Sequence, residues 1–457
     1  MPTFHDLPTE IQQYTFTLCM DPPQIHNTIY CWGAIYDSFK TRISIILVSK
    51  AWKALAESTP GLWTLIQVEG DCSNEKNLSL AQTWLLRSGT LPINLIVTQP
   101  TSISEPFVQL LKSKIFQCRT IAMNLAGKDF GERTNKSFAP ETILPSTNIE
   151  LPNLKSLTSF RNYDWVSSSP YSIHAPHLRT LGLGGHALST LGNLTTDTLH
   201  ALHTLDIDHP AGPPDMRILI NCPNLRHLMW SSEHPNRVID NDSLITLPFL
   251  TNLSFFDTSY GFMPLWIKGF IKAPVLRHLS YMHTDHQGPA ASSNLLHINE
   301  FATFSSTLIT MRLTSFTLTS IPQGVPTPFF PNLTTLDIFN CKIEDAYFDC
   351  LNAVTGEDNK SVTRCLSKFN IDKCTLNVDT LEKWLDSRAA SSHLRLPQMR
   401  IFCWDTQHVQ VQKLAERYSN IFVPPEPTYI YRDNLENENG EEDEDEDDVI
   451  FFMYAYD

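Results

Sequence analysis

The chain has 457 residues, of which 42% are hydrophobic and 18% charged, a balance typical of globular rather than disordered proteins. The formal net charge is −15, but residues 433–457 hold twelve Asp and Glu and no Lys or Arg, so subtracting those twelve leaves −3 for the body. A nearly neutral body lacks the basic surface that phosphate backbones require, which argues against nucleic-acid binding.

Targeting signals are missing from the sequence. The opening "MPTFHDLPTEIQQYTF" has neither the basic nor the apolar region of a signal peptide, and no stretch reaches 18 uncharged apolar residues. We therefore expect a cytoplasmic or nuclear protein that does not enter a membrane. The ten cysteines include no CxxC pair, so we expect reduced thiols and no zinc site.

The first 66 residues predict a small helical module. In "DLPTEIQQYTFTLC", Pro8 stands at a helix start, and apolar residues follow at helical spacing. The stretch "TRISIILVSKAWKALAEST", residues 41–59, predicts one further amphipathic helix with Ile45, Val48, Trp52 and Leu55 on one stripe, ended by Pro60. Such short helices bury little area alone, so the module must pack on the rest of the chain or bind a partner.

Three pieces of this module resemble the F-box motif of the fungal, mushroom-type family, in which the box precedes leucine-rich repeats. They are "LPTEI" from Leu7, "LVSKAWKALAEST" from Leu47 and "PGLW" from Pro60, and "WLLRSGTLPINLIV" from Trp84 is similar to the segment that follows the box. Thr15, Lys53 and an insertion over residues 19–41 depart from the family pattern.

The resemblance implies a role for the box residues. Trp63 would close the box towards the repeats, and five residues would bind the Skp-family linker of a cullin ubiquitin ligase: Leu7, Pro8, Ile11, Val48 and Trp52. The alternative is that this stripe is ordinary intramolecular core.

Residues 67–150 are expected to link the module to a repeat array over residues 151–432, and to contribute atypical capping repeats. One string of apolar residues at relative positions one, four and six recurs ten times, with starts 23 to 33 residues apart. The copies begin at Leu154, Leu178, Leu202, Leu225, Leu250, Leu276, Leu308, Leu333, Leu366 and Leu396.

Each copy predicts a short strand, a turn and a helix, which is the pattern of a leucine-rich repeat. Stacked copies would form a curved parallel sheet with helices outside. The predicted fold is therefore α/β, with an all-α F-box, a leucine-rich-repeat solenoid and a disordered acidic tail over residues 433–457. Cys341 and Cys374 fall on the template position that satisfies backbone groups beyond the strand, so we assign both a structural role.

Strand residues that alternate with the repeat leucines would face the concave side, where they are either solvated or bind a protein substrate. The candidate substrate-binding residues are Asp206, Asp208, His227, Met229, Phe256, His278, Met282, Arg312, Asp337, Phe339 and Asn370.

Motifs for chemistry are weak. "GLGGHA", Gly182–Ala187, fits a dinucleotide-binding pattern, but its leucines keep the repeat register. Three HxxH pairs begin at His174, His200 and His283, and none is an HExxH motif. No spacing singles out a nucleophile and base, so we predict no catalytic, cofactor or metal-binding residue and no enzymatic activity.

These observations favour a substrate-recognition subunit of a Skp-cullin-F-box ubiquitin ligase. One alternative is an F-box repeat scaffold that acts outside ubiquitination, and a more distant one is an enzyme with a nucleotide or metal site in the repeats. The tail, "EEDEDEDDVIFFMYAYD" from Glu441, is either a solvated segment or a regulatory or docking peptide.

Overall fold

The structure is a computed structural model. It describes most of residues 4–423, namely residues 4–18, 41–72, 75–124, 148–160, 172–184, 191–208, 216–232, 245–257, 271–283, 295–297, 301, 303–320, 330–352, 354–355, 360–391, 394–403 and 408–423. The predicted tail therefore lies outside the described residues.

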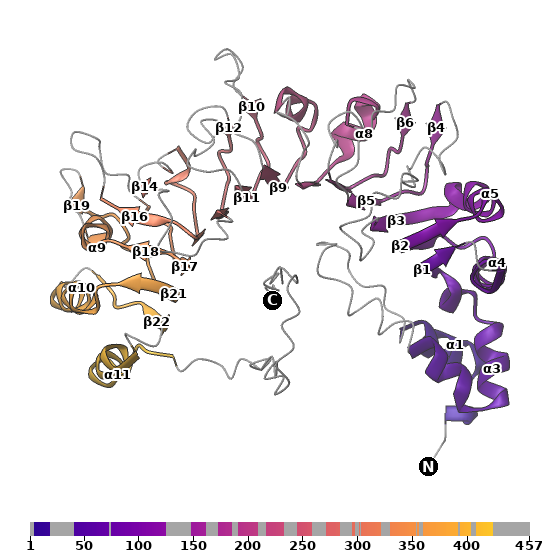
Figure 1. Ribbon diagram of the computed structural model, residues 1–457, viewed down its shortest axis with the longest axis horizontal. Coiled ribbons are helices and arrows are strands. Elements are labelled where there is room, and N and C mark those ends of the chain that lie inside the picture. The colour runs from indigo at the N-terminus through magenta and orange to yellow at the C-terminus, as the bar shows by residue number, and fades with distance from the viewer. Residues whose placement is uncertain are drawn as a thin grey trace, which may run out of the picture.

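The fold is mixed α/β and is organised around one long parallel sheet of 16 strands. Figure 1 shows the sheet lining the inner side of an arch, with helices α4, α5, α9, α10 and α11 towards the outside. Thirteen of the strands follow chain order along the arch, so each connection carries the chain to the next neighbour. The predicted parallel sheet with outer helices is confirmed at this level.

The strands of the arch are short and regularly placed. They are β1 (Leu65–Cys72), β2 (Ile93–Ile103), β3 (Cys118–Asn124), β5 (Ser156–Phe160), β7 (Thr180–Gly184), β8 (Thr204–Asp208), β9 (His227–Ser232), β11 (Asn252–Asp257), β13 (His278–His283), β15 (Thr310–Thr314), β17 (Thr335–Phe339), β21 (Lys368–Leu376) and β22 (Gln398–Cys403).

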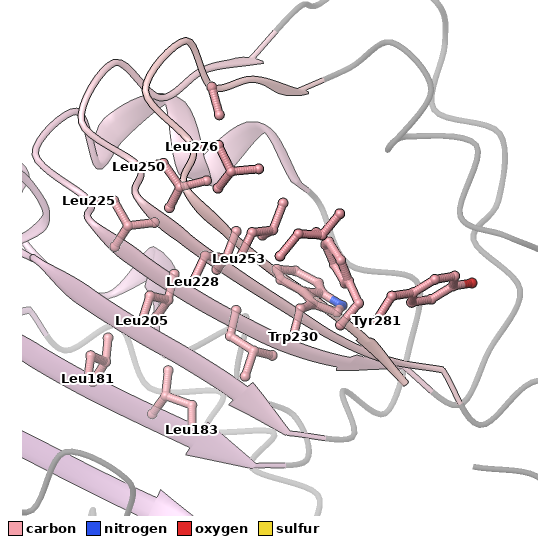
Figure 2. Close-up of a cluster of buried hydrophobic side chains, with 14 of the residues drawn as sticks. Leu181, Leu183, Leu205, Leu225, Leu228, Trp230, Leu250, Leu253, Leu276 and Tyr281 are labelled. Carbon is pink, nitrogen blue, oxygen red and sulfur yellow. The ribbon is translucent and has the colours of Figure 1, made fainter. Parts of the chain in front are cut away.

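The repeat leucines stand in register across this sheet. Leu181 pairs with Leu205, Leu205 with Leu228, and Leu228 with Leu253, so one apolar position of every copy forms a row. Figure 2 shows a second such row, in which Leu225, Leu250 and Leu276 stack behind the strands. Every leucine that opens a copy from Leu154 to Leu366 is at most 1% exposed. The ten predicted copies correspond to the ten strands from β5 to β22.

The prediction of a helix in every copy is met only in part by the described residues at the centre of the arch. In the described parts, the return path holds two six-residue elements, the α-helix α8 (Thr196–Ala201) and the 3-10 helix η4 (Met216–Asn221). It also holds two-residue strands: β4 (Ile149–Glu150), which precedes the first copy, β6 (Ile173–His174), β10 (Ile245–Thr246) and β12 (Ile271–Lys272). These copies span 23 to 26 residues, and residues 161–171, 185–190, 209–215, 233–244 and 258–270 within them lie outside the described part.

Longer copies near the end do contain the predicted helices. The copies that begin at Leu333 and Leu366 span 33 and 30 residues and hold α9 (Asp345–Asn352) and α10 (Val378–Ala390). The Asn377 side chain caps α10 by accepting the Asp379 N–H at 3.2 Å. Helix α11 (His408–Arg417) covers the last strand.

Beyond the main strands, a second ladder of short parallel strands joins the later copies. It contains β14 (Leu295–His297), β16 (Thr317–Thr319), β18 (Lys342–Ile343) and the end of β21. A separate antiparallel pair, β19 (Val354–Thr355) with β20 (Lys360–Ser361), follows α9. Between the main strand and the second ladder, Ser315, Asn340 and Lys373 adopt left-handed backbone conformations with φ of 62°, 51° and 52°.

The two predicted structural cysteines hold this bend together. The Phe316 N–H donates to Cys341 Sγ at 3.4 Å, and the Cys341 N–H donates to Cys374 Sγ at 3.4 Å. Both thiols are fully buried. The structural role predicted for Cys341 and Cys374 is therefore confirmed.

The segment predicted as a link belongs to the same sheet. Strands β1, β2 and β3 extend it in parallel, connected by α4 (Glu75–Ser88) and by α5 (Glu105–Lys114) with η3 (Ile115–Gln117). At the open end of the arch lies the N-terminal module, with η1 (Phe4–Asp6), α1 (Thr9–Leu18), a helix over residues 41–48, α3 (Lys50–Glu57) and η2 (Pro60–Trp63).

Candidate functional site

Helix α1 carries an apolar stripe that the protein leaves exposed. Ile11, Tyr14 and Leu18 follow one another at intervals of three and four residues, so they share one face of α1, and their exposed fractions are 47%, 61% and 57%. Leu7, two residues before the helix, is 39% exposed. Phe16, on another face of the helix, is only 2% exposed. The helix thus packs through Phe16 and presents its larger apolar face to solvent.

The single helix predicted over residues 41–59 is in fact two helices. Ser49 has extended backbone and caps α3, because its hydroxyl accepts the Trp52 N–H at 3.1 Å. The break separates residues that one continuous helix would have placed on one stripe. Val48 is 59% exposed, whereas Ile45 is buried.

Trp52 is placed differently from the other predicted linker-binding residues. Its ring centroid lies 4.9 Å from that of Phe4 and 5.0 Å from that of Phe16, so it belongs to an aromatic cluster inside the module. Leu7, Pro8, Ile11 and Val48 are exposed, while Trp52 is half-buried. For Trp52, the structure therefore favours the intramolecular alternative.

Trp63, the residue expected to close the module towards the repeats, lies at the joint between α3 and α4, in the segment that precedes the repeats. It is 1% exposed, and its indole N–H donates to the Ala56 carbonyl at 2.9 Å. The Arg87 guanidinium of α4 lies 4.5 Å from the Trp63 ring centroid, and Arg87 also pairs with Glu57 of α3 at 2.8 Å.

Arg42 strengthens the same joint. Its Nη2 donates to the Leu65 carbonyl at the start of β1 at 2.7 Å, and its guanidinium lies 4.7 Å from the Trp84 ring centroid. Burial lowers the pKa of Arg42 to about 10, so the side chain stays charged at neutral pH. No pattern in the sequence singles out Arg42, since an arginine at the start of an amphipathic helix is ordinarily solvated.

On the concave face, an apolar patch crosses the central strands. Ser231, Phe256 and Met282 are neighbours in one row, and Met229 lies on the row beside it. Phe256, Met282 and Met229 are half-buried, which leaves part of each side chain accessible. The predicted residues His227 and His278 are exposed and lie in a further row, at the first position of β9 and β13.

Next to this patch is a polar cluster on β15, β17 and β21. Arg312 Nη2 lies 3.6 Å from Asp337 Oδ2, and Asn370 Nδ2 donates to Asp337 Oδ1 at 2.7 Å. All three occupy one row, and the next strand adds Arg400. In the adjoining row, the ammonium group of Lys373 lies 5.6 Å from the ring centroid of the half-buried Phe339.

Two further residues of the predicted surface differ from the rest. Asp206 is on the expected row but is only 7% exposed, so a partner cannot reach it as it reaches Phe256 or Arg312. The side chain of Asp208 lies outside the described residues, although its backbone pairs with Gly184. Partial burial and the neighbouring Arg277 lower the pKa of His278, which favours neutral imidazole at pH 7.

The weak chemical motifs fall within the repeat framework. Gly182 lies in β7, and Leu181 and Leu183 pair along the sheet as in other copies, while residues 185–187 are outside the described part. In the described ranges, no three His, Cys, Asp or Glu side chains gather where they could hold a metal ion. His286, the second member of one HxxH pair, is not described.

Sequence reasoning missed Tyr14, Leu47, Arg400 and Lys373 as surface residues beside the predicted ones. Leu47 is 76% exposed, and only the helix break at Ser49 explains why an apolar residue of this region faces solvent. Within the described ranges, no helix is both long and apolar enough to cross a membrane. A comparison with known families and with curated proteins finds no match for this chain.

Proposed function

We propose that this chain is an F-box protein with a leucine-rich-repeat solenoid, and that it recognises substrates for a Skp-cullin-F-box ubiquitin ligase. The observation that supports this most directly is the number of exposed apolar side chains on the N-terminal module: Ile11 and Leu18 of α1, Leu7 just before α1, and Leu47 and Val48 of the helix over residues 41–48. Exposed apolar side chains gathered on short helices are typical of a surface that another protein covers.

The module is well placed to serve as an attachment point. It is anchored to the sheet through Trp63 and Arg42, so a partner held by α1 would stand in a fixed position relative to the concave face. In the proposed assembly, the linker and cullin bring the ubiquitin-charged enzyme, and the arch holds the substrate protein near it. The rate gain would come from proximity, and no residue of this chain would act chemically.

The substrate would bind the concave face through an apolar centre and a polar flank. Phe256, Met282 and Met229 can take an apolar side chain, while Arg312, Asp337 and Asn370 offer a charged pair and an amide. This arrangement fits a protein surface better than a small molecule, because binding energy in protein interfaces concentrates in a few apolar or arginine anchors with a polar rim.

The experiment is co-purification with a fungal Skp-family linker, using Val48→Asp and Val409→Asp as a matched pair. Both valines are strongly exposed, at 59% and 64%, but Val409 lies on α11 at the far end of the arch. A carboxylate buried in an apolar interface costs about 2 kcal/mol or more, so Val48→Asp should weaken linker binding roughly 30-fold. Val409→Asp should leave it unchanged.

Substitution of Trp52 would be a poor test, because its contacts with Phe4 and Phe16 make loss of folding an alternative cause. Ile11→Asp on α1 supplies a second exposed position instead. If the linker does not bind, or if Val48→Asp and Val409→Asp bind it equally well, the proposal is wrong.

Two other outcomes would favour the alternatives. Linker binding without ubiquitin transfer to any captured protein would favour a scaffold role. Stoichiometric nucleotide or metal in the purified chain would favour an enzyme. On the substrate side, Phe256→Asp/Met282→Asp should release captured proteins, measured by quantitative proteomics of the complex, without changing linker binding. Retention of the same proteins by this variant would contradict the assigned face.

A further inference from the structure

A row of mostly basic residues crosses one edge of the sheet, where the strands begin. The backbone N–H of Arg179 donates to the Lys155 carbonyl at 2.8 Å, and that of Lys155 donates to the Arg119 carbonyl at 2.8 Å. The same ladder continues through His203, Arg226, Thr251 and Arg277. One residue from each of seven neighbouring strands thus stands in a single row, which we call the cationic edge.

The cationic edge is accessible. His203 is half-buried. The five Arg and Lys side chains are exposed: Arg119, Lys155, Arg179, Arg226 and Arg277. Within the described ranges, no ion pair joins any of these five to a carboxylate. Arg179 donates to the Ala201 carbonyl at 2.6 Å, which fixes its side chain without neutralising its charge.

Acidic residues are missing from the surrounding positions too. Each rung is preceded by a tight turn, as where the Leu178 N–H donates to the Ala175 carbonyl at 2.9 Å. The seven segments made of turn, rung and first strand residue contain no Asp or Glu: residues 116–120, 151–156, 175–180, 199–204, 222–227, 247–252 and 273–278. Positive charge therefore accumulates along these seven segments with no carboxylate within them.

The chain itself carries a segment of opposite charge. Residues 441–448, "EEDEDEDD", are eight consecutive carboxylates in the acidic tail, while residues 1–432 have a formal net charge of only −3. Neighbouring strands are about 4.8 Å apart, so the six steps from Arg119 to Arg277 span about 29 Å. Eight residues in extended conformation span about 26 Å. The two charged rows match in length.

The connecting chain is long enough for this contact. The Val423 N–H donates to the Met399 carbonyl of β22 at 2.8 Å, and β22 is four strands from β13, which Arg277 precedes. The near end of the cationic edge is therefore about 19 Å away and the far end about 48 Å away, at about 4.8 Å per strand. Residues 424–440 can extend over about 56 Å.

We propose that the acidic segment Glu441–Asp448 binds in cis along the cationic edge. Binding in cis has the advantage of an effective concentration in the millimolar range, so even a weak electrostatic contact is mostly formed. The edge borders His227 and His278, so the bound segment lies beside the proposed substrate surface. The contact itself does not depend on the ligase function.

The test uses a fluorescent peptide of residues 439–450 and fluorescence anisotropy, with the full chain and a chain truncated after residue 432. The truncated chain should bind the peptide, and the full chain should bind it about tenfold more weakly, because its own segment competes at millimolar effective concentration. Affinity should fall steeply from 50 to 500 mM NaCl, since the Debye length shortens from about 14 to about 4 Å.

Two triple variants of the truncated chain then locate the contact. Lys155→Glu/Arg226→Glu/Arg277→Glu reverses the cationic edge, and Lys342→Glu/Lys383→Glu/Lys413→Glu makes the same charge change at exposed lysines of β18, α10 and α11. The first variant should lose peptide binding at least tenfold more than the second. A peptide with Gln and Asn in place of Glu and Asp should not bind either chain.

Equal losses in the two triple variants would overturn the proposal, because the attraction would then follow net charge alone. Equal binding of the peptide by full and truncated chains would overturn binding in cis. Circular dichroism of both variants separates loss of folding from loss of contact. If the edge variant does not fold, the comparison of full and truncated chains and the neutral peptide still decide whether the segment binds in cis. The single variants Arg226→Glu and Lys342→Glu, both at exposed side chains, then locate the contact, and equal losses in these two would overturn the assigned edge.

Discussion

Replacement of Trp63 by alanine should release the N-terminal module from the sheet without unfolding the repeats. A buried tryptophan covers about 200 Å², worth about 5 kcal/mol at 25 cal/mol per Å², and substitutions of this kind cost about 3–5 kcal/mol in protein cores. Trp63 also donates to the Ala56 carbonyl and lies against Arg87, so the loss should reach about 4 kcal/mol.

In a repeat structure each element contacts mainly its neighbours, so the loss should stay local. A change of about 4 kcal/mol raises the population of the opened module about a thousandfold. Native-state hydrogen exchange should therefore accelerate by up to about three powers of ten at the amides of α3, η2 and β1, and stay unchanged at β11 and β13.

Trp230→Ala is the matched control, because Trp230 is also 1% exposed but lies on β9 in the middle of the arch. Its loss should accelerate exchange around β8, β9 and β11 and spare the module. If Trp63→Ala accelerates exchange in the module less than tenfold, or accelerates it equally along the whole sheet, then the joint assigned to Trp63 is wrong.

Three further predictions concern buried side chains and the bend. Arg388 is fully buried and donates to the Thr363 hydroxyl at 3.1 Å and to the Thr363 carbonyl at 3.2 Å. Arg388→Met should therefore lower the free energy of unfolding, measured by urea titration, by about 2–4 kcal/mol. An effect no larger than that of Arg395→Met, at an exposed arginine, would contradict this prediction. Burial raises the pKa of the Cys118 and Cys222 thiols to about 12, so both stay protonated at pH 8. Iodoacetamide should therefore alkylate the exposed Cys365 first, as followed by peptide mass spectrometry. Equal alkylation rates at the three thiols would refute this prediction. Lys373 has a left-handed backbone with φ of 52°. Lys373→Gly should change the free energy of unfolding by less than about 1 kcal/mol, because relief of backbone strain offsets the lost contact with Phe339, whereas Lys373→Val should lower it by about 2 kcal/mol in the same titrations. Equal effects of the two substitutions would argue against the left-handed conformation.

Much of the repeat framework could be predicted from the chain because its signals are local. Leucines at relative positions one, four and six determine which residues of each copy face inward, and neighbouring copies then align by pairing like positions, as Leu205 does with Leu228. The structural role of Cys341 and Cys374 could be predicted for the same reason, since both stand at a fixed number of residues after the apolar residues of the strand.

Other features depended on contacts between residues distant in the chain. From the sequence, Ser49 could either continue a helix or cap a new one. In the structure it caps α3, the helix whose Trp52 packs on Phe4 and Phe16. Asp206 alternates like the other concave residues, yet its burial depends on what surrounds it rather than on its place in the strand.

The sequence by itself determined the order of the strands and the inward face of each, because the apolar period of a repeat acts within a few residues. Only the tertiary structure decided that the apolar face of α1 stays exposed and that scattered basic residues from Arg119 to Arg277 form one row. Both features arise when segments that are many residues apart in the chain pack side by side. The spacing of residues along the chain does not indicate how far apart such segments lie in space.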